Sequence, residues 1–139
     1  MLNLEAEKVA QQPWWFVVQA AAGDDPAVEV EFVPIGRAAL RAARRAAAAA
    51  VGAALPEADD DTALPVELVE QAGDILSEQL LLAGIRAWRG VGDADGNLAP
   101  VTPDNLRLFL ADPTRFERLE EAYVRPFVLK EMEKNASSL

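Results

Sequence analysis

Neither cysteine nor histidine occurs among the 139 residues of this chain. Without cysteine there can be no disulfide and no zinc site built on thiolates. Without histidine the chain lacks the usual general base near neutral pH and the commonest metal ligand, so histidine-activated nucleophiles are also excluded. Only carboxylates, lysines and one tyrosine remain for chemistry, and their spacing predicts no paired acid and base. We therefore expect no enzyme, no catalytic residue, no metal and no cofactor.

Positive charge is scarce as well, because 13 lysines and arginines stand against 23 acidic residues, for a net charge of −10. Phosphate backbones need clustered cations, so nucleic acid is not an expected partner. The most hydrophobic run of small residues, Ala46 to Leu55, is about half as long as a membrane span. The first ten residues carry charges and do not resemble a targeting signal. We expect a cytoplasmic protein that does not enter a membrane.

Residues 14–35 are predicted to form a β-hairpin. Residues 14–18 are aromatic and β-branched, which favours a strand. Residues 28–33 alternate apolar side chains with glutamates, the pattern of a strand with one wet face. Between them, residues 23–26 are Gly-Asp-Asp-Pro, which is typical of a turn. Residues 1–12 are polar and are predicted to be frayed.

The remainder of the chain is predicted to be helical. We expect a mainly α protein of the α+β class, in which the hairpin is followed by about four helical segments over residues 36–135. All of it should form one domain, 1–139, that ends in a polar tail at residues 136–139. Residues 36–55 are rich in alanine, the residue with the highest helix propensity. The acidic stretch at residues 57–61 is predicted to be a surface loop.

Helix start and stop signals divide the second half of the chain. Residues 65–89 repeat apolar side chains at helical spacing, and the glycine that follows should end this helix, the spine of the core. Thr102-Pro103 and Asp112-Pro113 each combine an N-cap with a first-turn proline. Pro126 lacks an N–H and should kink or split the last helix.

Large aromatic side chains are the candidates for contacts with a partner protein, because such residues dominate binding hot spots. For Trp14, Trp15 and Phe16 a place in the core is equally expected, whereas Trp88 is expected to be a core anchor. Three consecutive rings in a strand cannot all face one side, so at least one of those in 14–16 should point away. A second candidate is the stripe Arg37, Arg41, Arg44 and Arg45, which could bind an acidic partner or simply form a solvated helix face. The aromatic candidates are Trp14, Trp15, Phe16, Trp88, Phe109, Tyr123 and Phe127.

The turn Asp93-Ala94-Asp95-Gly96-Asn97 has the oxygen spacing of a calcium loop. However, such a loop has glycine at its sixth position, where this chain has Leu98, and it closes on a glutamate, where this chain has Asp104. A plain Asp-Gly-Asn turn is the preferred interpretation.

The order of several motifs resembles the tail assembly chaperones of long-tailed bacteriophages and prophages. In that family a helix ending in tryptophan leads into a glycine-rich stretch and an Asp-x-Asp-Gly turn, matched here by residues 87–97. A Thr-Pro start to a short leucine-rich helix follows, matched by residues 102–106. A later helix carries Tyr123, and a Lys-Asn pair stands at 134–135. The likeness runs from Leu80 to Asn135; the sequence Pro13-Trp14-Trp15 is not typical of the family.

The resemblance implies a protein of the host bacterial cytoplasm that binds the tape-measure protein, keeps it soluble and promotes assembly of the tail-tube protein around it. It implies no cofactor. Helix-in-groove recognition would suit such a client. The alternatives are another virion morphogenesis protein, such as a ring-forming head–tail connector, and a small acidic adaptor or antitoxin-like binding protein. A homo-oligomer is compatible with each.

Overall fold

The computed structural model describes residues 1–54 and 65–137. The chain forms two compact units, one made of Met1–Pro34 with Leu81–Leu139 and the other of Ile35–Leu80. The single domain expected from the length stays a prediction, and the predicted acidic loop at 57–61 lies outside the described residues.

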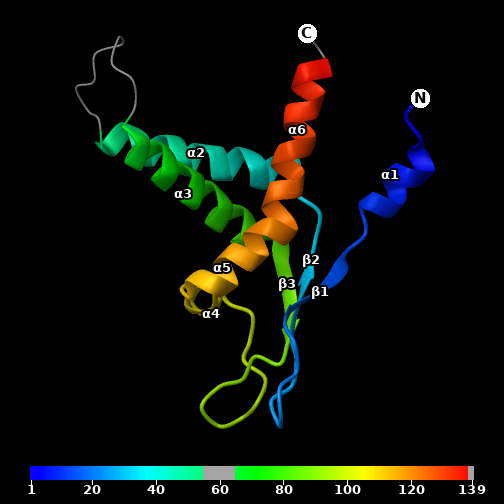
Figure 1. The fold of residues 1–139 in the computed structure, drawn as a ribbon, viewed down its shortest axis with the longest axis vertical. Coiled ribbons are helices and arrows are strands. Elements are labelled where there is room, and N and C mark those ends of the chain that lie inside the picture. Colours follow the sequence, from blue (N-terminus) through cyan, green and yellow to red (C-terminus); the bar gives the residue numbers. More distant parts are fainter. Residues whose placement is uncertain (55–64, 138–139) are drawn as a thin grey trace. The chain divides into compact units, whose positions relative to one another are not determined.

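The first unit is built on a three-stranded antiparallel sheet (Figure 1). Strands β1 (Trp14–Gln19) and β2 (Val28–Phe32) confirm the predicted hairpin. A third strand, β3 (Ile85–Arg89), pairs with the other edge of β2, so the sheet order is β1-β2-β3. Together with the helices that follow, this confirms the mainly helical α+β class.

The prediction of one helix over residues 65–89 is wrong at its C-terminal end. Helix α3 (Val66–Gly84) stops five residues earlier, and the chain continues as β3. Ile85 and Trp88 are both buried although they are three residues apart, because the β2–β3 pairing shifts its register between Glu31 and Phe32; Arg86 and Arg89 are exposed. Pairing with β3 gives hydrogen-bond partners to backbone N–H and C=O groups of β2 that the β1–β2 hairpin leaves unpaired. These long-range hydrogen bonds outweigh the local helix propensity of the segment, so it forms a strand.

Gly90 ends β3 rather than a helix. Its φ is +77°, a backbone conformation that residues with a side chain rarely adopt. A Cβ at this position would also overlap the carbonyl oxygen of Ala27. The glycine therefore allows the backbone at the end of β3 to lie close to Ala27, just before β2.

One face of the sheet forms the core of this unit. Its side chains include Val18, Val30, Phe32 and Trp88, all buried. Helices α4 (Pro103–Leu110) and α5 (Pro113–Leu119) contribute the opposing apolar residues Leu106, Phe109, Leu110 and Leu119. Both helices begin as predicted, because the Thr102 hydroxyl accepts from the N–H of Asn105 at 3.2 Å and the Asp112 carboxylate from that of Arg115 at 2.9 Å.

The N-terminal segment is not frayed as predicted but contains helix α1 (Leu4–Ala10). The Asn3 side chain accepts hydrogen bonds from the N–H groups of Glu5, at 3.0 Å, and Ala6, at 3.3 Å, and so caps the first turn. No residue of α1 is buried. The cap stabilises a helix whose side chains gain little from packing.

The last helix is split near Pro126, as predicted, by one turn of π-helix. Helix α5 leads into η1 (Glu120–Val124) and then into α6 (Arg125–Ser137). The N–H of Arg125 donates to the carbonyl of Glu120, five residues earlier. The wider turn comes directly before the proline, which cannot donate to the carbonyl of Ala122. Because α6 runs to Ser137, the polar tail predicted from residue 136 is in part helical.

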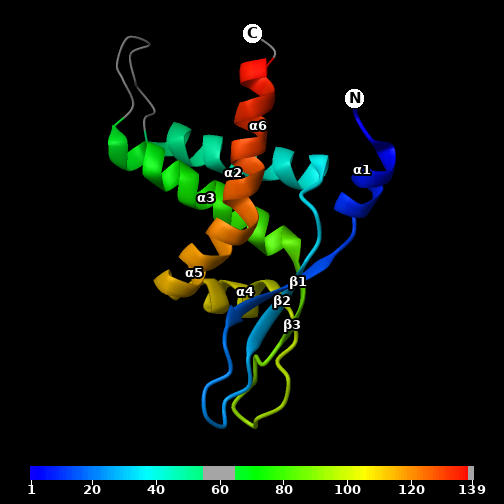
Figure 2. The same ribbon diagram turned by 45° about the vertical axis from the view of Figure 1, so that its right-hand side comes forward.

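The second unit contains α2 (Arg37–Ala54), as predicted, and α3 as far as Leu80. The two helices lie closest at the end of α2 and the start of α3 and diverge from there (Figures 1 and 2). On α2 the buried Ala43 and the half-buried Leu40, Ala47 and Val51 share one face. The arginines of α2 lie on a neighbouring face, about 110° around the helix.

Candidate binding surfaces

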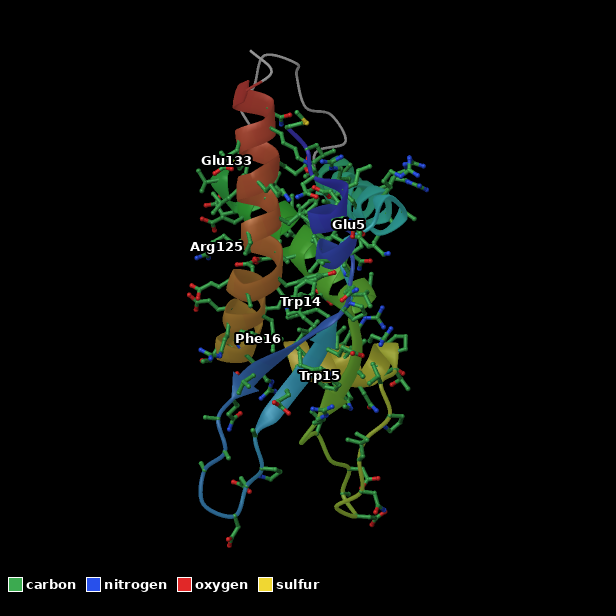
Figure 3. The ribbon with its side chains drawn as sticks, turned by 90° about the vertical axis from the view of Figure 1, so that its right-hand side faces the viewer. Glu5, Trp14, Trp15, Phe16, Arg125 and Glu133 are labelled. Atoms are coloured by element: carbon green, nitrogen blue, oxygen red, sulfur yellow. The ribbon has the colours of Figure 1, made fainter. Side chains whose placement is uncertain are left out.

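The three aromatic residues at the start of β1 face alternate sides of the sheet, as predicted. The ring of Trp14 lies 5.5 Å from that of Phe32 and 6.0 Å from that of Tyr123. Phe16, two residues on, lies 6.0 Å from Phe32 on the same face. Figure 3 shows these side chains on β1 beside the rod formed by α5 and α6. Trp14 remains 40% exposed, so this side of the core is incompletely covered.

Trp15 lies on the opposite, wetter face of the sheet. The guanidinium of Arg89 stacks 3.8 Å from the centre of its ring, a cation–π contact. Arg89 also lies 3.7 Å from Glu29, and Arg86 is paired with Glu31 at 2.9 Å. The indole is 37% exposed between these charges. This face of the sheet therefore carries one partly exposed aromatic ring surrounded by charged side chains.

Tyr123 belongs to the core. Its ring stacks on Phe32 at 4.4 Å, and its hydroxyl donates to the carbonyl of Val33 at 2.6 Å. Burial raises the pKa of Tyr123 to about 12, because the charged phenolate would lose its hydration. Gly84 makes room for the hydroxyl, since a Cβ there would overlap it. These contacts tie the end of β2 to η1 and to the end of α3.

Trp88 and Phe109 are also buried, with their rings 5.3 Å apart. The indole N–H of Trp88 donates to the carbonyl of Ala99 at 2.7 Å. Arg115 donates from Nε to the carbonyl of Phe109 at 2.8 Å and lies over its ring. A pocket of about 360 Å³ lies beside this cluster. Trp88 is thus a core anchor, as expected, but it sits in a strand and not at the end of a helix.

The Asp93 turn is held by its own backbone. The Asp93 carboxylate accepts from the N–H groups of Asp95, at 2.9 Å, and Asn97, at 3.0 Å. Gly96 has a φ of +80°, and Gly92 pairs with Leu98 across the turn. This is the geometry of an Asp-Gly-Asn turn. Within residues 1–54 and 65–137, no group of three or more acidic side chains is placed to hold a metal ion.

The C-terminal helix presents an apolar stripe that sequence reasoning missed. Val128, Leu129 and Met132 are 37%, 54% and 62% exposed. Their positions span about 100° of the helix circumference. Phe127, a predicted binding residue, lies about 100° away from Val128 and is half-buried, so it does not belong to this stripe. Figures 1 and 2 show α6 extending away from the sheet. The stripe (Val128, Leu129 and Met132) is exposed on this helix.

The predicted arginine stripe is present on α2. Arg37, Arg41, Arg44 and Arg45 are all exposed and line a pocket of about 380 Å³ together with Leu40 and Ala48. None of the four makes an ion pair with another residue in the described part of the chain. We call these four residues the basic stripe. Unpaired cations at helical spacing form a surface that can bind carboxylates.

An acidic stripe on α3 was not predicted. Its members are Glu67, Glu70, Asp74 and Glu78, of which the first three are exposed and the last half-buried. Steps of three and four residues place them within about 80° of the helix circumference. That spacing is readable in the sequence and could have identified the stripe. We found no ion pair between it and any other described residue.

The structure therefore separates the predicted aromatic residues into two groups. Trp14, Trp15, Phe16 and Phe127 keep some exposed surface, whereas Trp88, Phe109 and Tyr123 are enclosed and cannot contact a partner without local opening. The described helices include none long and apolar enough to cross a membrane.

Comparison with protein-family models, with curated proteins and with solved structures gives no match for this chain.

Proposed function

We propose that this protein is a non-enzymatic binding protein of the bacterial cytoplasm that acts as a phage tail assembly chaperone. Its client is the tape-measure protein, and tail-tube subunits assemble on the complex. The apolar stripe of α6 is the client-binding surface. The observation that carries the proposal is the exposure of Val128, Leu129 and Met132 on a helix that extends away from the sheet.

The chemistry of this stripe suits an apolar helical client. Side chains at positions i, i+1 and i+4 form a seam against which another helix can pack. Glu131 and Glu133 lie on the same helix, one on each side of the stripe, and supply a charged rim. A rim of this kind keeps the free protein soluble while the seam is unoccupied.

The size of the stripe indicates weak binding by each copy. Full burial of one such side chain contributes about 1.5–3 kcal/mol, and these three are already partly covered. Association itself costs at least about 4 kcal/mol. One copy would therefore bind weakly, and copies bound along one long client would hold it more firmly only where neighbouring copies also contact one another. Coating a long protein is the mode of action that the resemblance implies.

The motifs that support the resemblance do not all keep their expected structure. The glycine-rich turn and the Thr-Pro helix start are formed as the family pattern requires. The tryptophan of the pattern, Trp88, lies in β3 rather than at the end of a helix. The proposal therefore rests on the turn, the helix start and the open stripe of α6.

Co-expression with the tape-measure protein from the same locus tests the proposal. The wild-type chain should raise the soluble fraction of that client and co-purify with it. Leu129→Ser/Met132→Ser should abolish both effects, whereas the matched control Lys130→Ser, on another face of α6, should retain them. Failure of the wild-type chain to raise client solubility would contradict the chaperone function. Equal activity of the stripe variant and wild type would contradict α6 as the binding surface.

A further inference from the structure

The basic stripe of α2 needs a partner of opposite charge, and the chain itself carries one. The four arginines occupy about 100° of the α2 circumference and about 12 Å of its length. The acidic stripe of α3 offers four carboxylates over about 80° and about 16 Å. Both stripes lie in the same compact unit, residues 35–80. The two sets therefore have the same number of charges, opposite signs and similar axial lengths.

Neither stripe is neutralised within the described chain. The six ion pairs seen there join other residues, on the sheet, on α4 and around α6. Every arginine of the stripe is exposed, and so are Glu67, Glu70 and Asp74. Each charged set is therefore open to another molecule.

We propose that the basic stripe of α2 binds the acidic stripe of α3 in a second copy of this chain. Because each copy carries both stripes, two copies in an isologous contact form the arginine–carboxylate interface twice. The net charge of −10 opposes the approach of a nucleic acid and of a second copy alike, but only a second copy offers carboxylates to the basic stripe and arginines to the acidic stripe at once. The inference does not depend on the chaperone function and concerns a different surface from the α6 stripe.

The interaction should be weak and sensitive to salt. Exposed ion pairs contribute little each, although planar guanidinium groups pair with carboxylates better than lysines do. Charges at the surface are screened over about 10 Å at 0.1 M salt and over about 3 Å at 1 M. Self-association is therefore expected at high protein concentration and low salt, and it should decrease steadily as salt is added.

A charge-swap experiment with the full chain tests this interface. The first variant is Arg41→Glu/Arg44→Glu and the second is Glu70→Arg/Asp74→Arg. Each alone presents like charges to its own copies, so its self-association constant should fall about tenfold or more in low salt. An equimolar mixture restores opposite charges at both contacts and should associate at least as well as wild type. Sedimentation equilibrium measures all three, and circular dichroism verifies that each variant is folded.

A matched control separates local pairing from net charge. Lys8→Glu/Lys130→Glu changes the net charge by the same amount as the first variant, but at exposed sites on α1 and α6. It should leave self-association within about twofold of wild type. If a swapped variant does not fold, two other measurements test the interface. The neutral variant Arg41→Gln/Arg44→Gln should associate more weakly than wild type, and association of the wild-type chain should decrease as salt is added. A wild-type chain that stays monomeric at about millimolar concentration in low salt, or a mixture that does not regain association, would overturn the proposal.

Discussion

Replacing Tyr123 by phenylalanine removes one atom from the core, and its effect on stability should depend on pH in a defined way. The hydroxyl donates to the carbonyl of Val33 at 2.6 Å, while the ring packs on Phe32 at 4.4 Å and would do so equally in phenylalanine. The variant leaves the carbonyl without this donor in a largely buried site. Near neutral pH we expect the free energy of unfolding to fall by about 1–3 kcal/mol.

The pH dependence follows from the raised pKa of Tyr123. Its phenol has a pKa of 10.0 when unperturbed and about 12 in the folded chain. The neutral hydroxyl is thus favoured by folding, and this stabilisation is complete below pH 10 and is lost as the pH rises through 10 to about 12. At pH 11 linkage makes the loss about 1.4 kcal/mol, relative to pH 9 or below.

Two measurements examine this expectation. Tyr123 is the only tyrosine in the chain, so the ultraviolet absorbance of phenolate reports its titration directly. Urea unfolding of wild type and Tyr123→Phe at several pH values gives the second measurement. Any other effect of alkali acts on both proteins, so the difference between the two isolates Tyr123. The reasoning is refuted if the phenol titrates near pH 10, or if both proteins lose stability equally between pH 9 and 11.

Two other substitutions probe the same core by urea unfolding. Gly84→Ala should destabilise the chain by about 1–3 kcal/mol because its Cβ would overlap the Tyr123 hydroxyl; its matched control, Gly73→Ala, meets no atom within 4 Å on the same helix and should stabilise by up to about 1 kcal/mol. Equal effects of the two alanines would contradict the packing described for Gly84. Trp88→Phe should cost about 1–3 kcal/mol, because it leaves the carbonyl of Ala99 without its indole donor and shrinks a buried ring; a loss below about 0.5 kcal/mol would show that this hydrogen bond contributes little.

Sequence patterns predicted the hairpin and the helix starts because these depend on neighbouring residues. The N-caps at Thr102 and Asp112 act within three residues, and the alternation in β2 is local as well. Strand β3 could not be predicted in this way. Its residues continue the apolar spacing of α3, and only pairing with β2, more than fifty residues earlier, makes them a strand.

The binding surfaces were predicted less well than the fold. The basic stripe could be read from four arginines at helical spacing, and it lies where expected. The seven aromatic residues could not be sorted, because a ring in a core and a ring on a surface have the same sequence signature. The stripe of α6 was missed for a related reason. Its residues look like core residues, and only the direction of the helix leaves them exposed.

The π turn at Glu120–Val124 also fixes the rotational phase of everything that follows it. One residue more than an α-helical turn needs is accommodated there, and each residue of an α-helix corresponds to about 100° of rotation. Because the wide turn absorbs that residue, deleting Ala122 would let the helix run on regularly from α5 while Leu129 and Met132 kept nearly the direction they have now. The bulge therefore compensates for one residue: if all residues were kept but the turn became α-helical, the C-terminal stripe would rotate by about 100° and face another side.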